Sequence, residues 1–497
     1  MPVLGRNSLT TSDRARRDDD DNGPQRTRAS ARPHELEPGH QRRLERSELR
    51  KLSPELGVCL SRIEDPTLLA PRQAGALRTG QNLAVPDNGG GHDPRAGGVV
   101  VTVADANPAH RDTAPTSEPS TGARGAVRLA VRSVRSPAIR VLGIYAAVRI
   151  VLLVADVLSA HVSYGSNLSG PLHSWDSSWY LTIAVHGYPP VAPRVGGGLT
   201  YSAAGFMPVF PALIHFFTLF GLSAVVSGLV VSILGGGAAT LIVLRLGTVL
   251  VNQPTGWNAA VLFTLFPGMA ISWGLLYCEC VGLAFTAASL LLMVRKRWIW
   301  AGILGAFATA TSPLALPLAL GAAVPAVQAL RNREPPRALY AVFLVPTGFV
   351  AFLVFLSARY HDVFFWWHLQ HQGWGVSVDY GRSLLGLLPH LWRIGFQGPA
   401  WLDWTGLVFV AAGGFALWRA KLPACVRAYC LGVVLVLFAS NNLGFKPRLL
   451  TWAFPVLIAV AKIARPRTRT AVVIVFACLL PLVFLAYTTV GNTMAQP

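Results

Sequence analysis

The residues of this sequence best suited to chemistry are carboxylates that stand alone among aromatic and apolar residues. Asp176 is the clearest case, because it lies in the segment HSWDSSWY (173–180), directly after the first apolar run of membrane length. Of the 24 Asp and Glu residues, 17 precede Ala138, and only seven remain in the apolar part of the chain. An ionised side chain at membrane depth costs roughly 2.5 to 3.5 kcal/mol, so we expect Asp176 to be functional.

Two roles for Asp176 are consistent with its neighbours. If residues 175–186 are helical, Trp175, Trp179 and Ile183 fall at i, i+4 and i+8 and form a stripe suited to the lipid headgroup region. The helix would then hold Asp176 at the boundary between water and lipid, where a lipid-linked sugar and an acceptor hydroxyl can meet. The alternative is that Asp176 caps the helix, since Asp is a preferred N-cap residue.

Three further charged residues have the chemistry to act with Asp176. Glu279 lies between two apolar runs, so it is either a second acid near a substrate or a side chain that reaches water from a loop. Lys446 and Arg448 flank a proline at the start of an apolar run, on the face predicted below to be external. Basic residues there run against the positive-inside rule, so we expect them to bind a phosphate group.

Residues 358–402 are rich in aromatic side chains and contain the candidate binding residues His368, His371, Trp374 and Arg382. Such a segment can cover a prenyl chain or a sugar ring at the membrane surface. His368 and His371 have a spacing that suits a metal ion, but no nearby carboxylate clearly completes a set of three ligands. We therefore expect no metal.

Two polar features inside apolar runs are interpreted as structural. Asp156 and Arg149 stand seven residues apart in the first apolar run and could pair across two helical turns. The glycines at 235–237 lack the Lys-Ser or Lys-Thr that follows a phosphate loop. We expect these glycines to permit close helix packing.

The composition predicts an all-α membrane protein with a bundle of about 10–12 transmembrane helices. Hydrophobic residues make up 52% of the 497 residues. The formal charge of +19 could suggest nucleic acid, but the basic residues of the apolar part lie in short clusters between runs, which is typical of cytoplasmic loops. The predicted spans are 138–160, 223–250, 257–277, 280–294, 299–311, 314–330, 338–357, 403–418, 424–440, 449–463 and 470–490. The basic clusters are 295–297, 331–337, 419–421 and 465–469.

The predicted topology gathers the candidate residues on one face of the membrane. With the N-terminus in the cytoplasm and segment 206–221 interfacial or re-entrant, all four basic clusters fall on the cytoplasmic side. The outer face then carries the Trp175-Asp176 loop, the hinge at 277–279, the 358–402 loop and segment 441–448. A transporter would more often place its polar groups near the bilayer midplane, so this convergence favours a surface site.

The chain divides into two parts of different composition. Residues 1–137 are rich in Arg, Asp, Pro, Gly and Ser and lack sustained apolar periodicity, so we expect a disordered cytoplasmic extension, with an overlong gene model as the alternative. Residues 138–497 are expected to form the transmembrane domain, with outer-face loops at 162–205 and 358–402.

A series of short motifs runs in order from about Val141 to the C-terminus. The most specific is WDSSWY at 175–180, followed by IA at 183–184, GYP at 187–189 and FMPVFP at 206–211. Weaker matches are Tyr277 with Glu279, residues 364–374, and the segment 446–448 running into Phe454-Pro455. Together these motifs resemble the PIG-V family, which comprises the GPI second-mannose transferases and their bacterial relatives within the GT-C glycosyltransferases.

The resemblance implies a multi-span helical transferase with an extracytoplasmic active site. It would take mannose from a polyprenyl-phosphate carrier and add it to a glycolipid, with Asp176 as catalytic base. Its partners would be the polyprenyl-phosphate-mannose donor, the glycolipid acceptor and the bilayer, without nucleic acid or a further cofactor. An excess of 38 Arg over 5 Lys is typical of GC-rich coding sequence and suggests an actinobacterial source, hence a bacterial plasma membrane.

The chemistry of the residues agrees with an inverting transfer. One carboxylate must take the proton of the acceptor hydroxyl, a role worth about 10²- to 10⁴-fold in rate, and Asp176 can supply it. Lys446 or Arg448 could stabilise the departing phosphate without a metal. Glu279 would be the nucleophile of a retaining reaction. Trp175, Trp179 and Tyr180 are candidate donor or acceptor contacts. The alternatives are a non-enzymatic transporter or flippase, and a transferase that uses prenyl-linked arabinose or glucose.

Overall fold

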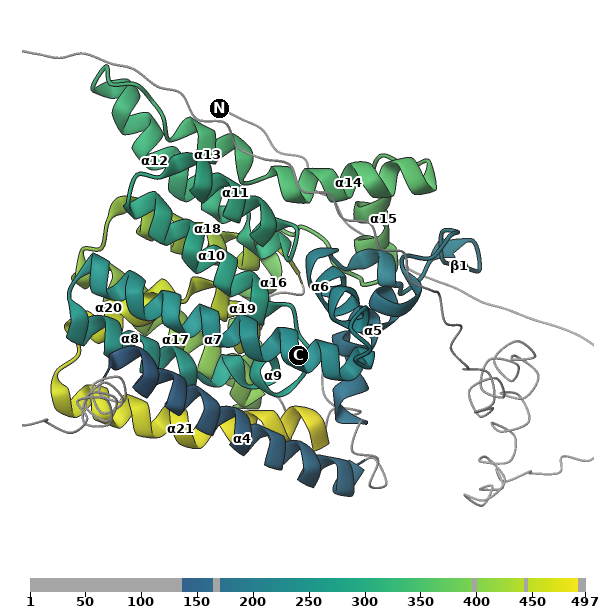
Figure 1. Ribbon diagram of the computed structural model, residues 1–497, viewed down its shortest axis with the longest axis horizontal. Helices are drawn as coiled ribbons and strands as arrows, with labels where there is room; N and C mark the ends of the chain where they lie inside the picture. Colours follow the sequence, from purple (N-terminus) through teal and green to yellow (C-terminus); the bar gives the residue numbers. More distant parts are fainter. Residues whose placement is uncertain (1–135, 164–169, 396–399, 442–445, 490–497) are drawn as a thin grey trace, which may run out of the picture. The chain divides into compact units, whose positions relative to one another are not determined.

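The computed structural model describes residues 136–163, 170–395, 400–441 and 446–489. The predicted extension at 1–137 and part of segment 441–448 therefore lie largely outside the described residues. The described chain is helical apart from one short hairpin, and its elements are labelled in Figure 1. The α-helices are α4 (Pro137–Ser163), α5 (Asp176–His186), α6 (Val209–Thr218), α7 (Ala224–Leu250), α8 (Gln253–Leu265), α9 (Ala270–Gly274), α10 (Glu279–Val294), α11 (Trp298–Thr309), α12 (Pro317–Arg331), α13 (Leu339–Leu344), α14 (Thr347–Tyr360), α15 (Phe365–Gln372), α16 (Arg382–Ile394), α17 (Ala400–Ala420), α18 (Ala424–Phe438), α19 (Pro447–Leu450), α20 (Pro455–Ile463) and α21 (Pro466–Thr489). The 3₁₀ turns are η1 (Pro171–His173), η2 (Ala203–Gly205), η3 (Pro267–Met269), η4 (Pro313–Ala315) and η5 (Thr451–Ala453).

The membrane-crossing character predicted from composition is confirmed. Five helices in the described ranges are long and apolar enough to cross a bilayer, and a sixth span is possible if one bent pair counts as a single crossing. The five are Pro137–Val162, Ala224–Leu250, Pro313–Arg331, Leu339–Tyr360 and Pro466–Thr489. Of the remaining predicted spans, 403–418 lies in the unbroken 21-residue helix α17, which is not among these five, and the others form shorter or broken helices. Helix length and composition thus support fewer crossings than the 10–12 expected.

The predicted span 257–277 is wrong as a continuous helix. The helix stops at Leu265 before Pro267, and the chain continues through η3 and α9 before turning by 119° into α10. Proline lacks the N–H for an i to i−4 hydrogen bond and disfavours helical backbone in the residue before it, which accounts for the break. Segment 206–221 forms the ten-residue α6, which at about 1.5 Å per residue is too short to cross.

The long helices pack around one apolar core. Figure 1 shows α4 and α21 side by side beneath α7 and α8, and all four contribute to the same cluster of buried side chains. The glycine run 235–237 permits this packing, as predicted. A Cβ at Gly236 would collide with Tyr145 of α4 and the ring of Trp273 in α9, while one at Gly235 would meet the backbone of Cys280.

The pairing expected between Asp156 and Arg149 is wrong. Both side chains are buried on the inner face of α4, at 4% exposure each, but no ion pair joins them. All three guanidinium nitrogens of Arg149 and Oδ1 of Asp156 are without hydrogen-bond partners in the described part of the chain. Two turns of helix separate the residues, and the side chains do not close that separation.

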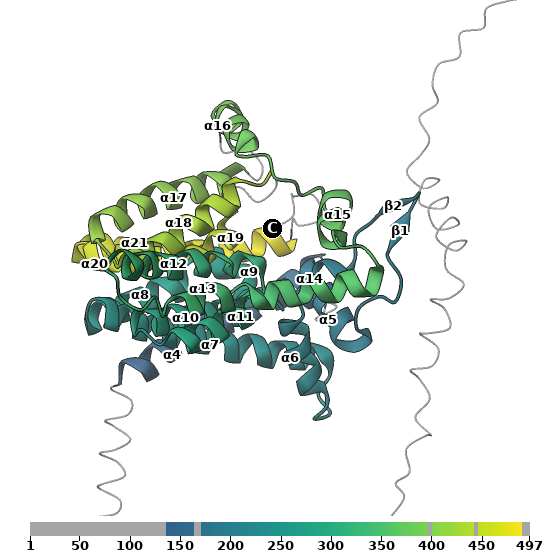
Figure 2. The same cartoon turned by 90° about the horizontal axis from the view of Figure 1, so that it is seen from above.

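A second group of elements lies at one end of the helical bundle. In Figures 1 and 2, α5, α6, α14, α15 and the hairpin of β1 (Arg194–Val195) and β2 (Gly198–Leu199) gather there. The hairpin turns at Gly196 and Gly197, which both have positive φ, as a tight two-residue turn requires. The N–H of Leu199 donates to Gln372 Oε1 at 2.9 Å, which ties the hairpin to α15.

The close contact at Gly236 gives a stability prediction. Gly236→Ala should lower the melting temperature of the detergent-solubilised protein, since its methyl group forces α7 away from Tyr145 at a cost of about 1–3 kcal/mol. Gly143→Ala is the matched control, because a Cβ on that glycine of α4 meets nothing within 4 Å. Equal melting temperatures for the two variants would contradict this packing.

Candidate active site

The site begins where the N-terminus of α5 meets the unwound segment between α9 and α10. The backbone N–H of Leu276 donates to Ser177 Oγ at 3.3 Å, and the N–H of Asp176 donates to Tyr277 Oη at 3.3 Å. Helix N-termini leave N–H groups without partners inside the helix, and Tyr277 satisfies one of them. Two hydrogen bonds across about 100 residues of sequence therefore fix the position of Asp176.

Asp176 does not cap its helix, so that interpretation is wrong. Trp175 occupies the N-cap position with φ of 56°, an uncommon backbone conformation for a residue other than glycine, and Asp176 is the first helical residue. The predicted lipid-facing stripe is also wrong. Ile183 is buried, and Trp179 stacks on Phe206 with ring centroids 6.1 Å apart, so this face of α5 packs against protein.

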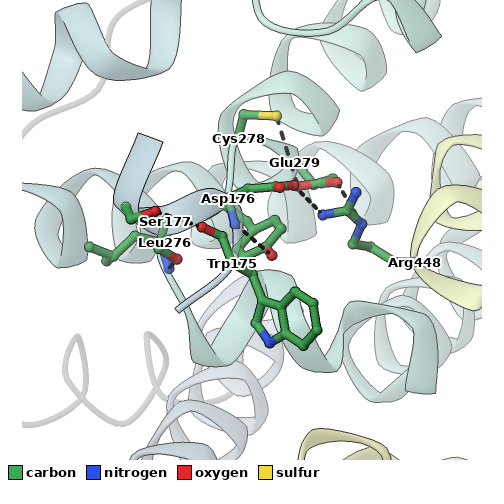
Figure 3. A network of polar contacts seen from close by, with 9 residues as sticks. Trp175, Asp176, Ser177, Leu276, Cys278, Glu279 and Arg448 are labelled. Atoms are coloured by element: carbon green, nitrogen blue, oxygen red, sulfur yellow. Dashed lines mark hydrogen bonds and ion pairs between the residues drawn. The ribbon is translucent and has the colours of Figure 1, made fainter. Parts of the chain in front are cut away.

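The carboxylate of Asp176 binds Arg448, which is 272 residues further along the chain. Arg448 Nη1 donates to Asp176 Oδ2 at 2.8 Å, and Arg448 Nε lies 3.6 Å from Glu279 Oε1 (Figure 3). The guanidinium also lies over the ring of Tyr277, 4.9 Å from its centroid. The side chains of Arg448, Asp176 and Glu279 are 13%, 26% and 4% exposed, so Glu279 is enclosed and Asp176 still reaches solvent.

Lys446 lies beside this centre. It is half-buried, and burial together with the neighbouring Arg448 lowers the pKa of its ammonium group from 10.5 to about 8. The charges of Asp403 and Asp176 partly oppose that lowering. Lys446 is thus a cation close enough to interact electrostatically with Arg448 and Asp176, and it loses its positive charge as the pH rises through about 8.

An aromatic group forms one wall next to Asp176. Trp374 makes edge-on contacts with Trp179 and Phe206 at centroid distances of 6.2 and 5.5 Å, and Tyr180 packs edge-on against Phe206 at 5.2 Å. The Nε1–H of Trp374 is buried and has no acceptor in the described part of the chain. A buried indole N–H normally finds a partner, whereas this one packs against Gly205, where an added Cβ would lie 3.0 Å from Nε1.

The remaining residues predicted in segment 358–402 lie apart from Asp176. His368 Nδ1 is 2.7 Å from Asp362 Oδ2, so this histidine has one carboxylate neighbour. His371 and Arg382 are exposed and form no hydrogen bond or ion pair through their side chains within the described residues. Across the described ranges, no group of three or more His, Cys, Asp or Glu side chains is placed to hold a metal ion.

Segment 358–402 nevertheless joins the same face as the centre. Asn441 binds it twice, by accepting from the N–H of Ser377 at 2.8 Å and donating to the carbonyl of Gly375 at 3.0 Å. A β-bridge between Val378 and Ser440 adds to this contact. The four sequence segments expected to converge therefore do so through contacts among their described residues.

An apolar groove of about 400 Å³ starts next to the basic residues. Pro447, which separates Lys446 from Arg448, lies in its wall, as does Trp404, which follows Asp403. The rest of the lining comes from Phe266, which precedes η3, and from η3, α17, α20 and α21, and it includes Phe409, Val456, Val460, Phe476 and Leu479. We call the end of the groove at Pro447 its entrance, because the two chain neighbours of this proline are the basic residues Lys446 and Arg448, which do not themselves line the groove.

Sequence reasoning missed two members of the site. Tyr277 was noted as part of a hinge and as a weak motif match without a role of its own, but its hydroxyl and ring contact Asp176 and Arg448. Asp403 was assigned to a predicted span, yet its charge acts on Lys446. It is one of the seven acidic residues of the apolar part, and the argument that an ionised side chain is costly at membrane depth, used for Asp176, also applies to Asp403. For Tyr277 the only sequence signal was its weak motif match together with Glu279.

The fold and the site define an all-helical membrane protein with a buried carboxylate–arginine centre. No protein-family model matches this chain, and no curated protein matches it significantly. Among solved structures it is similar to ArnT from Cupriavidus metallidurans bound to undecaprenyl phosphate, with a TM-score of 0.45 and 16% identity over 71% of this chain and 66% of that one. For the apo state of ArnT the TM-score is 0.45 and the identity 17%, over 73% of this chain and 67% of that one. For the Archaeoglobus fulgidus oligosaccharyltransferase in the apo form the TM-score is 0.39 and the identity 12%, over 68% of this chain and 55% of that one. Likeness at this level assigns no chemistry to this chain.

The hydrogen bond from Asp176 to Tyr277 can be tested by stability. Tyr277→Phe leaves the buried N–H of Asp176 without an acceptor, which should cost about 1–3 kcal/mol and lower the melting temperature. Tyr380→Phe removes the same atom from a side chain that is 88% exposed and should have no effect. If both variants have the melting temperature of the wild type, the hydrogen bond contributes nothing to the position of α5.

Proposed function

We propose that this protein is a membrane glycosyltransferase of the GT-C type, which moves a sugar from a polyprenyl-phosphate donor to an acceptor hydroxyl with Asp176 as general base. The observation that carries the proposal is the ion pair of Asp176 and Arg448 at the entrance of the apolar groove. This arrangement places a carboxylate, a pair of basic residues and a site for an apolar chain next to one another. A polyprenyl-phosphate sugar presents the complementary groups in the same order.

Each part of the donor has a counterpart in the structure. An isoprenoid chain suits the apolar groove, and its phosphate suits Lys446 and Arg448 at the entrance. The sugar would then lie towards Asp176 and the aromatic wall, where aromatic faces suit the ring of a sugar. Asp176, still partly exposed, would accept the proton of the attacking hydroxyl.

The finer assignments rest on the sequence motifs. The resemblance to the PIG-V family supports mannose as the sugar and a glycolipid as acceptor, with catalysis on the extracytoplasmic face of a bacterial plasma membrane. A GT-C transferase for prenyl-linked arabinose or glucose fits the same centre. Assays with different donors separate these cases.

A transporter is the second candidate, and one observation favours it. The guanidinium nitrogens of Arg149 and Oδ1 of Asp156 are buried in α4 without hydrogen-bond partners among the described residues, and ionisable groups of this kind inside membrane helices often mark a transport pathway. The residues gathered at the groove entrance favour the transferase instead, since a transporter needs no base beside a phosphate site.

The first functional prediction concerns Asp176. Asp176→Asn in the full chain should reduce transfer of labelled mannose from polyprenyl-phosphomannose to membrane lipids by about 10²- to 10⁴-fold, because the amide cannot take the hydroxyl proton. Asp379→Asn is the matched control, since Asp379 is a cap of α16 outside the centre. Undiminished transfer by Asp176→Asn would refute its role as base. Transfer only from arabinose or glucose donors would change the sugar, and failure of every donor would favour the transporter.

The second prediction concerns the charge of Lys446. Its pKa near 8 means that the ammonium is mostly charged below that pH and loses its charge as the pH rises through it. Affinity for undecaprenyl phosphate should therefore fall by up to about tenfold between about pH 7.5 and 9.5, where the phosphate itself is already dianionic. Lys446→Arg stays charged and should abolish the fall. The same pH profile in both proteins would exclude Lys446 from the phosphate site.

A further inference from the structure

Arg448 is the side chain that contacts both carboxylates of the centre. Its Nη1 donates to Asp176, while its Nε faces Glu279 at 3.6 Å without a hydrogen bond (Figure 3). A guanidinium has five N–H donors in a rigid planar fork, so the bond to Asp176 leaves donors for another oxygen ligand. Arg448 can therefore be shared between a resident carboxylate and an incoming anion.

The position of Arg448 relative to the groove makes that anion the donor's phosphate. Pro447 is the neighbour of Arg448 in the chain and lines the groove, and Lys446 is the next residue. A phosphate held at this entrance would meet two cations that already face three carboxylates, those of Asp176, Glu279 and Asp403. Since Nη1 of Arg448 already donates to Asp176 and its Nε faces Glu279, the anion competes with these carboxylates for the guanidinium.

On the basis of the proposed function, we propose that Asp176 and the donor phosphate compete for Arg448, and that proton transfer to Asp176 hands Arg448 over to the leaving phosphate. Before reaction, Arg448 holds Asp176 as a carboxylate, the form that can act as a base. After the proton arrives, Asp176 is neutral and its bond to Arg448 weakens, since charge-assisted hydrogen bonds are about twice as strong as neutral ones.

The charges balance in this step. The acceptor oxygen bonds to the anomeric carbon, and the bond from that carbon to the phosphate oxygen breaks with its electron pair remaining on the phosphate. The phosphate thereby goes from one negative charge to two, while the proton of the hydroxyl takes Asp176 from one negative charge to none. Stabilisation by Arg448 therefore moves to the position where charge develops in the transition state.

Glu279 has a different role in this arrangement. Glu279 is the first residue of α10 and directly follows Tyr277 and Cys278. Its side chain is 4% exposed, so it is enclosed by protein. Together with the ring of Tyr277 beneath the guanidinium, it holds Arg448 at the centre when Asp176 releases it. Glu279 is thus a positioning residue for Arg448, and not the nucleophile of a retaining reaction.

The test uses equilibrium binding of radiolabelled undecaprenyl monophosphate to the full chain in nanodiscs. Asp176→Asn imitates the neutral, protonated state and should bind this product-like lipid at least about tenfold more tightly than wild type. Asp403→Asn is the matched control, since it removes the same charge near Lys446 without contact to Arg448 and should raise the affinity much less. Equal gains in the two variants would overturn the hand-over, because general electrostatics would then explain both.

A second background checks that the gain passes through Arg448. The affinity gain of Asp176→Asn should shrink in an Arg448→Lys chain, which keeps the charge but lacks the planar fork. A gain of full size in that background would also overturn the proposal. In the same assay, Glu279→Gln should bind the lipid more weakly than Asp176→Asn, because Arg448 is less firmly held, and an affinity equal to that of Asp176→Asn would refute its positioning role.

These outcomes are distinct from failure of the proposed function. If wild type binds undecaprenyl phosphate and transfers sugar but Asp176→Asn and Asp403→Asn behave alike, the transferase remains and the hand-over is wrong. If neither wild type nor any variant binds the lipid phosphate or transfers sugar, the transferase is wrong and the hand-over falls with it.

Discussion

The ion pair between Asp176 and Arg448 is the constraint around which the rest of the structure is arranged. A charged side chain is costly to place among membrane helices, and leaving one partner of such a pair alone typically costs 3–5 kcal/mol. The three segments that supply Asp176, Glu279 and Arg448 must therefore meet, although more than 270 residues separate the first from the last. The hydrogen bonds of Ser177 and Asp176 to the unwound segment before α10, and the ring of Tyr277 under Arg448, fix that meeting point.

Breaks in the helices make the meeting possible. A continuous helix through residues 257–277 would keep its backbone groups paired internally and could offer only side chains to α5. The chain unwinds after α9 and turns by 119°. The N–H of Leu276 is therefore outside a helix and donates to Ser177 of α5, and α10 then begins with Glu279 facing Arg448. Irregular backbone at membrane depth is tolerated only where protein or a water-filled cavity surrounds it, and Leu276 and Tyr277 are fully buried.

The groove and the charged centre form a single unit because Pro447 belongs to both. Its ring lines the apolar channel between α17, α20 and α21, while the residues on either side of it carry the positive charges. A ligand with an apolar chain and an anionic head would satisfy both regions at once. The aromatic wall of Trp179, Phe206 and Trp374 closes the side of the centre next to α5.

The sequence by itself determined the class of the protein and one residue of its charged centre. The apolar runs predicted a helical membrane protein, and the isolated position of Asp176 identified it because unpaired acids are scarce in such runs. The basic residues at 446 and 448 were found by their departure from the charge pattern of loops. These are properties of local composition, which sequence displays directly.

Tertiary structure alone decided which charges pair. Arg149 and Asp156 share a helix face, yet they do not bind each other, whereas Asp176 binds an arginine at the opposite end of the domain's sequence. Likewise His371 and Arg382 lie apart from the centre in spite of their suitable chemistry, whereas Tyr277, which the sequence marked only by a weak motif match, belongs to it. The physical reason is that an ion pair requires its atoms to lie within about 4 Å. Helix packing and the breaks at prolines set such distances, and neither residue type nor spacing along the chain encodes them.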